Sequence, residues 1–359
     1  MGTQNTDGAT IQGGSTDGSA DGSAARLSAG TVVRALDGSA DGSADGSADG
    51  SASIAMRAPL AAALIMSREG IVDPADSSTY GEIPVAQAGD GCARLARWSH
   101  DVQVSLVVQE LVARMAVVTN GSIAKISTRD RVIAMLTRPD DEKFRKEIPC
   151  VLVAAELRGE RSGEILGQLQ HQWPFWDSIL PVPPRRRGAT QVLLDAIFTV
   201  CSLMGQRVKH DFGCYRPFEL SPQVQPMIPT PGHGTYPMGH GAQAYAVAFV
   251  LHRLSSPAAG HSTEMSALSA MKLPPLVVQL YQLAARISEN RVIAGVHFPT
   301  DTEGGILLGL GLANDMLVYG DGAGKESVVK CVLETARREW PTYAVAATAP
   351  NATGSAAKS

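Results

Sequence analysis

Apolar residues recur at helical spacing along most of this chain. In the stretches 102–118 and 266–296 they stand three to four positions apart, which is the spacing of one face of an α-helix. Patterns that alternate between apolar and polar residues are few, and no strand followed by a glycine-rich loop and a helix indicates a dinucleotide-binding unit. The pattern therefore predicts a mainly α fold.

Two further apolar runs, 191–205 and 304–319, raise the question of a membrane span. Both are shorter than a span requires, and Asp195 and Asp315 interrupt them. They are typical of buried helices, so we expect no transmembrane segment. The N-terminus also lacks the basic and then apolar pattern of a secretory signal. We therefore expect a cytoplasmic protein, or one secreted without a recognisable signal.

The two ends of the chain differ in composition from the middle. Residues 17–24 and 37–52 consist of perfect DGSA repeats, six in all, without aromatic or branched aliphatic side chains. Such a tract cannot bury enough apolar surface to offset its ordering entropy, which predicts a disordered tail over 1–53. We expect a single helical domain over 54–347 and a flexible tail over 348–359.

Charge and cysteine usage exclude some classes of partner. The net charge is −4 and aromatic residues make up 5% of the chain, so nothing favours nucleic acid or an anionic membrane surface. The cysteines are odd in number, without metal-ligand spacing or an evident framework of bridges, so we expect reduced, mostly buried thiols. These cysteines are Cys92, Cys150, Cys201, Cys214 and Cys331.

Candidate chemistry begins where a long loop meets a helix. The loop 219–237 is rich in proline and glycine, and it leads into Pro237–His240 and an apolar helix. A helix N-terminus favours an anion, because its free N–H groups and its macrodipole are positive. Taken alone, however, His240 reads as a residue that merely caps the helix.

Two other polar clusters flank this helix start. Lys209 and Arg216 lie near the end of an apolar helix, which Pro217 terminates. Further on, Arg291 precedes His297 by six residues and Asp301 follows it by four, so the carboxylate can bond one ring nitrogen of His297. Each cluster alone has a structural explanation, but together they supply cations and histidines suited to an oxyanion.

In order and spacing, these clusters resemble the signature of a known superfamily. K-x6-R-P, then P-S-G-H, then S-R-x5-H-x3-D is the pattern of the vanadium-dependent haloperoxidases, the class A acid phosphatases and the type-2 phosphatidic acid phosphatases. The resemblance implies a helical bundle of that type. The matching positions are Lys209, Arg216, Pro217, Pro237, Gly239, His240, Arg291, His297 and Asp301.

The chain departs from the signature at two positions. Asn290 stands where the family has a serine before Arg291, and Met238 replaces the serine of P-S-G-H. In the family that serine hydrogen bonds an oxygen of the bound anion. Methionine cannot donate, which costs the anion about 1–3 kcal/mol if nothing replaces the contact.

The haloperoxidase interpretation implies orthovanadate as cofactor, with His297 as its only protein ligand and Asp301 orienting the ring. His240 then acts as acid and base, and the reactants are hydrogen peroxide and a halide or a small organic substrate. His233 lies at the spacing of the halide side, where bromide-using members have histidine. The resemblance also implies homodimers, and no membrane partner is expected. The implied anion-binding set is Lys209, Arg216, Met238, Gly239 and Arg291.

Two other interpretations stay open at this point. As a phosphatase, the protein would need no cofactor: His297 would attack phosphorus and His240 would protonate the leaving oxygen. As a non-catalytic relative, it would only bind an oxyanion. Met238 weighs against the haloperoxidase, because a thioether beside an oxidant is open to sulfoxidation. Three explanations of Met238 stay open: it faces away from the anion, the site carries out a different reaction on an organic substrate, or the site is degenerate.

Overall fold

The computed structural model describes residues 91–340, with the exception of 171 and 183–186. The expected tails at 1–53 and 348–359 lie outside the described residues. The elements in chain order are α4 (Gly91–Leu95), α5 (His100–Val112), β1 (Ala116–Asn120), β2 (Ile123–Ser127), β3 (Val132–Thr137), α6 (Asp141–Ala154), η2 (Ala155–Leu157), α7 (Arg158–Gln170), α8 (Trp173–Asp177), α9 (Gly188–Phe212), α10 (Pro217–Leu220), α11 (Gly239–Ser255), α12 (Met265–Ala270), α13 (Pro275–Ile293), α14 (Pro299–Gly322) and α15 (Val328–Glu339). The prediction of a mainly α fold is confirmed.

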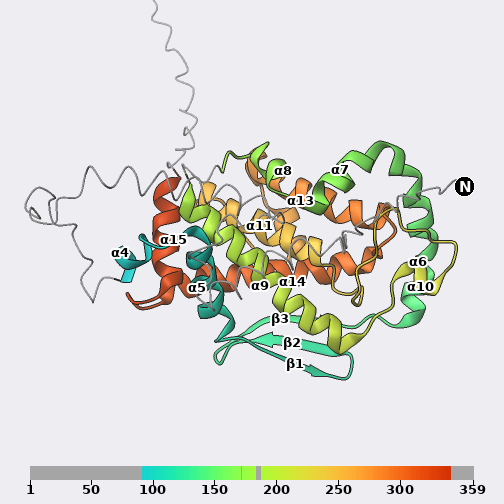
Figure 1. The fold of residues 1–359 in the computed structure, drawn as a ribbon, viewed down its shortest axis with the longest axis horizontal. Helices are drawn as coiled ribbons and strands as arrows, with labels where there is room; N and C mark the ends of the chain where they lie inside the picture. Colours follow the sequence, from blue (N-terminus) through green and yellow to red (C-terminus); the bar gives the residue numbers. More distant parts are fainter. Residues whose placement is uncertain (1–90, 171, 183–186, 341–359) are drawn as a thin grey trace, which may run out of the picture.

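Helix α11 forms the centre of this bundle. It is mostly apolar, is buried over nearly its whole length and is surrounded by α9, α13 and α14 (Figure 1), as expected for a helix without a continuous polar face. Helix α14 approaches it very closely, since a Cβ on Gly309 would lie 2.1 Å from the carbonyl oxygen of Ala242. A Cβ on Gly305 would lie 2.8 Å from the carbonyl oxygen of Met238. The two helices therefore run parallel, with their N-termini side by side.

A three-stranded antiparallel sheet, in the order β1-β2-β3, is the main element that the periodicity missed. It lies along one side of the bundle (Figure 1), against α14. The helix expected over 102–118 ends at Val112, because the chain turns into β1 four residues later. The β1–β2 loop contains Gly121 at φ 58°, a conformation that glycine adopts without strain.

The other three expected helices differ from the structure at their ends. The runs 191–205 and 304–319 are the inner parts of the longer helices α9 and α14. The stretch 266–296 is divided into α12 and α13, because the prolines at 274 and 275 begin a new helix and cannot continue an old one. Helix α13 then ends at Ile293, and Gly295 at φ 80° turns the chain toward His297.

The expectation of reduced cysteines is wrong for one pair. Cys92 of α4 and Cys331 of α15 form a disulfide, with their Cα atoms 5.3 Å apart. They are separated by 239 positions in the sequence, so no local spacing could announce the bond. Among the described residues, Cys150 is an exposed free thiol, whereas Cys201 and Cys214 are buried free thiols.

Candidate oxyanion site

The three polar clusters of the sequence meet where several helices begin or end. Lys209 lies in the last turn of α9, and Arg216 precedes the first residue of α10. His240 is the second residue of α11, Arg291 lies in the last turn of α13, and Asp301 lies in the first turn of α14. These five side chains and that of His297 are at most 2% exposed. So much buried charge is costly unless the site has a use for it.

His297 is held by Asp301 in one orientation. Its Nδ1 lies 3.0 Å from Oδ2 of Asp301, the contact that the spacing of the two residues predicts. The same carboxylate oxygen accepts a hydrogen bond from the hydroxyl of Thr235 at 2.5 Å and another from the backbone N–H of Phe298 at 2.8 Å. Because Nδ1 donates to the carboxylate, the lone pair of the neutral ring lies on Nε2.

Two opposing effects act on the Asp301 carboxyl. Burial raises its pKa above the ordinary value. Hydrogen bonds from Thr235 and the Phe298 backbone, and the charges of Lys209 and Arg216, work in the opposite direction. The carboxylate is therefore surrounded by groups that favour its charged form, despite its burial.

Arg216 connects His297 to His233. Its Nη1 lies 3.1 Å from Nε2 of His297 and donates to the carbonyl of Val296 at 2.7 Å. Its Nε donates to the carbonyl of His233 at 3.0 Å, and its Nη2 lies 3.1 Å from Nδ1 of the same residue. The structure thus brings His233 to the guanidinium that also faces His297.

Lys209 fixes the loop between His233 and His240. Its Nζ donates to the backbone carbonyls of Gly234 at 3.0 Å and Thr235 at 3.2 Å. A Cβ on Gly234 would approach the carbonyl oxygen of Lys209 to 3.0 Å, so this loop packs tightly on the end of α9. The ammonium group is therefore both an anchor for the loop and a buried positive charge.

Helix α7 contributes residues that the sequence did not single out. Nη2 of Arg291 donates to the carbonyl of Ile165 and to Oε1 of Gln168, both at 3.1 Å. Nδ2 of Asn290 donates to Oε1 of Gln168 at 3.1 Å and to Glu164 at 3.2 Å. Asn290, which replaces the motif serine, thus joins α13 to α7.

Met238 and Gly239 form the start of α11. Met238 is completely buried at the position before the helix, and its backbone N–H donates to the carbonyl of Asp301 at 2.9 Å. Its sulfur lies 3.9 Å from the hydroxyl of Thr302 on α14. Gly239 is the first residue of the helix, so the positive end of the α11 macrodipole lies beside the motif residues.

The donor set of this site suits an oxyanion. The motif supplies three cations, a helix N-terminus and one carboxylate, which lies behind the His297 ring. No group of three or more histidine, cysteine or acidic side chains among the described residues is arranged for a metal cation. Orthovanadate and phosphate both fit, because each presents negative oxygens to the cations and an electrophilic centre to Nε2 of His297.

A comparison with curated proteins found no match. The family model of the PAP2 superfamily matches residues 190–321, and this superfamily covers both type-2 phosphatidic acid phosphatases and vanadium haloperoxidase-like members. The matched segment runs from α9 to α14 and includes every motif residue of the site.

The match also bears on where the protein is found. Members of this superfamily are often membrane proteins. Within the described residues, one helical stretch, Gly188–Leu220, is long and apolar enough to cross a membrane, judged by length and composition alone. The expectation of a cytoplasmic or signal-less secreted protein without a transmembrane segment is therefore corrected.

The physical reason for this correction lies in α9 itself. Asp195 is one charged residue in a helix that continues well beyond 205, so it does not exclude the stretch by composition. Of the most apolar part of this stretch, 72% is buried inside the protein. The Asp195 carboxylate pairs with the His100 ring at 2.6 Å. Residues 190–321, which contain the complete set of motif histidines and cations, are thus the part of this chain that is similar to the PAP2 superfamily.

Proposed function

We propose that this protein is a vanadate-dependent haloperoxidase, which oxidises a halide, bromide before the others, with hydrogen peroxide. The proposal rests on one observation above all: Asp301 holds Nδ1 of His297, while Nε2 of the same ring faces Arg216. The match of residues 190–321 to the superfamily supports the coarser statement, an enzyme of the phosphatase and haloperoxidase type.

His297 is the residue that would bind the oxyanion covalently. A carboxylate on Nδ1 fixes the ring and makes the lone pair on Nε2 more basic, as second-shell carboxylates do for metal-bound histidines. Both groups are completely buried, so no solvent competes for either nitrogen. When bound there, vanadate would activate peroxide as a Lewis acid.

Lys209, Arg216 and Arg291 would neutralise the anion. Each is anchored by backbone carbonyls from another segment, which holds it in place before the anion arrives. Donors fixed in this way need little reorganisation when negative charge develops on the anion. His240, in the first turn of α11, is the group that would take and return the proton of peroxide, because imidazole exchanges protons near neutral pH.

His233 favours the haloperoxidase over the phosphatase. Its ring nitrogen lies 3.1 Å from the guanidinium of Arg216, so it belongs to the same hydrogen-bonded group as His297. A histidine beside an arginine provides the positive surroundings in which a halide ion is stable.

A phosphatase is the second candidate, and Met238 favours it. Its thioether is completely buried at the start of α11, two residues before His240 in sequence, where its sulfur contacts the Thr302 hydroxyl. A phosphatase produces no oxidant, so this sulfur would not be at risk. In this reaction Nε2 of His297 would attack phosphorus and His240 would protonate the leaving oxygen, with no cofactor.

One preparation, stripped of metal and divided in two, distinguishes these functions. The first half receives orthovanadate, peroxide, bromide and a dione whose absorbance falls on bromination; the second half receives an aryl phosphate. We expect bromination that depends on vanadate. Phosphate release that vanadate inhibits would establish the second candidate instead, and vanadate binding without either reaction would indicate a non-catalytic relative.

The variant His297→Ala tests the assignment of the site. It removes the only proposed covalent ligand, so we expect loss of orthovanadate binding and of turnover in whichever assay the wild type is active. Circular dichroism should show the helical content of the wild type. Activity that survives this change would contradict the assignment of the site to His297.

A further inference from the structure

Gln168 of α7 presents a buried amide group to the site. Its side chain is 1% exposed, and its Oε1 accepts hydrogen bonds from Arg291 and Asn290. Its Nε2, by contrast, has no hydrogen-bond partner among the described residues. A buried amide N–H without a partner costs about 1–3 kcal/mol, which natural proteins rarely tolerate without a use.

The orientation of this amide is determined by its neighbours. Nη2 of Arg291 and Nδ2 of Asn290 are both donors, so the oxygen of Gln168 must face them. Rotating the amide by a half turn would set its NH₂ group against two other donors. Nε2 is therefore the amide atom that does not face these two donors, and its N–H groups are available to an acceptor that the described residues do not supply.

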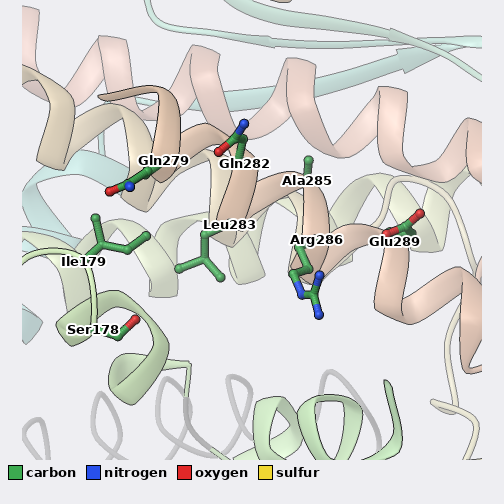
Figure 2. A pocket seen from close by; sticks show the side chains of 8 residues that line it. All are labelled: Ser178, Ile179, Gln279, Gln282, Leu283, Ala285, Arg286 and Glu289. Atoms are coloured by element: carbon green, nitrogen blue, oxygen red, sulfur yellow. The ribbon is translucent and has the colours of Figure 1, made fainter. Parts of the chain in front are cut away.

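Helix α7 holds Gln168 firmly in this place. One turn earlier, Glu164 accepts a hydrogen bond from Nε of Arg286 at 2.7 Å and another from Asn290. Arg286 lies on the wall of a surface pocket of about 770 Å³ between α13 and the segment that follows α8 (Figure 2). The contact of Arg291 with the Ile165 carbonyl adds a further connection between α7 and α13. The amide is thus fixed before any ligand binds.

We propose that Nε2 of Gln168 donates a hydrogen bond to the oxyanion that Arg291 binds. This inference rests on the proposed function and adds a donor from outside the sequence motif. Because Oε1 of Gln168 lies 3.1 Å from the guanidinium, one tetrahedral anion can reach both residues with donor–acceptor distances of about 2.9 Å. Helix α7 then forms part of the anion site and selects ligands with an acceptor oxygen on that side.

Calorimetric titration of orthovanadate into the full chain tests this role. Gln168→Met removes the amide at similar volume, and we expect its dissociation constant to rise about 10- to 100-fold, as for a lost hydrogen bond to a charged group. The matched control is Gln279→Met, the same change on the exposed face of α13, which should bind like the wild type. Equal affinity of Gln168→Met and wild type would overturn the proposal.

A second measurement separates donation from mere positioning of Arg291. The side-chain amide resonances of Gln168, assigned by their absence in Gln168→Met, should shift on addition of orthovanadate to the ¹⁵N-labelled wild type. If affinity falls in the variant but these resonances do not move, Gln168 only positions Arg291 and the proposal is wrong. A wild type that binds no orthovanadate would instead overturn the proposed function.

Discussion

Helix α14 carries two buried carboxylates, Asp301 and Asp315, that have different roles. Asp315 receives direct hydrogen bonds from Arg114 and Arg131, whose side chains are 21% and 34% exposed. Asp301 instead accepts hydrogen bonds from the His297 ring, the Thr235 hydroxyl and the Phe298 backbone N–H. The buried cations around it donate to backbone carbonyls, as Lys209 does. The two carboxylates are fourteen residues apart, about 21 Å along the helix.

The difference shows how one helix can carry both a structural and a reactive carboxylate. Around Asp315, charge is paired with opposite charge and the cations keep contact with water. These ion pairs join the β2–β3 loop and the turn between α5 and β1 to the bundle. Around Asp301, the hydrogen bonds orient a histidine, and the neighbouring cations are anchored by neutral oxygens. The first arrangement favours stability, whereas the second favours binding of an anion.

Asp301→Asn should have the largest effect on the reactive side of this comparison. An asparagine amide cannot accept from His297, Thr235 and the Phe298 backbone as the carboxylate does, so the ring loses its fixed tautomer. We expect turnover to fall by about 10²- to 10⁴-fold in steady-state assays. Asp321→Asn, an exposed carboxylate on the same helix, is the matched control. Wild-type turnover in Asp301→Asn would remove the reason for treating the two carboxylates differently.

Asp315→Asn should show the reverse result. It leaves Arg114 and Arg131 without their anion, and the loss is reduced because both arginines are partly exposed. We expect the free energy of unfolding to fall by about 3 kcal/mol in urea titrations, with an unchanged affinity for orthovanadate. A weaker affinity at unchanged stability would mean that Asp315 belongs to the site.

His252 of α11 is a buried structural histidine whose protonation should affect stability but not the oxyanion site. Burial, together with the charges of Arg253 and His261, lowers its pKa to about 4, and its Nδ1 lies 3.1 Å from the Tyr281 hydroxyl. At a pH between the unfolded pKa of about 6.5 and the folded pKa, the unfolded chain binds one proton more than the folded protein. Neutral His252 therefore leaves the free energy of unfolding undiminished above pH 6.5, and this stability is lost as the pH falls toward 4.

The neutral variant His252→Gln measures this contribution. From pH 7 to 4.5, the wild type should lose about 2–3 kcal/mol more stability than the variant, as determined from urea midpoints at each pH. Affinity for orthovanadate at pH 7 should be the same in both proteins. Parallel pH profiles would show that other groups cause the acid destabilisation.

Met238→Ser should have the smallest effect. The new hydroxyl restores a donor at the start of α11, and we expect orthovanadate to bind about five- to tenfold more tightly, measured by calorimetry. The sulfur now lies beside Thr302, so unchanged affinity would mean that the side chain at 238 faces α14 and not the anion.

The contacts within each motif cluster could be predicted where the residues lie close together along the chain. His297 and Asp301 are four positions apart, so the turn into α14 brings them together whatever the rest of the fold. The four buried helical runs also follow from their spacing, although their ends do not. Prolines and Gly295 determined where α12 and α13 stop, and a period of 3.6 residues says little about such breaks.

What the sequence did not reveal depends on contacts between distant segments. The cations are anchored by backbone carbonyls, which every residue type offers, so no residue identity announces them. Gln168 reaches Arg291 across 123 positions, and Cys92 reaches Cys331 across 239. The hairpin of β1 and β2 could have been predicted, since Asn120-Gly121 between two short apolar runs is a recognised turn signal.

A crystal structure of the protein with bound orthovanadate tests the central claim most directly. The account predicts vanadium bonded to Nε2 of His297, with its oxygens contacting Lys209, Arg216 and Arg291. Vanadate bound elsewhere on the protein, or none at a concentration that saturates related histidine sites, would contradict the assignment of an oxyanion site at the start of α11 and α14.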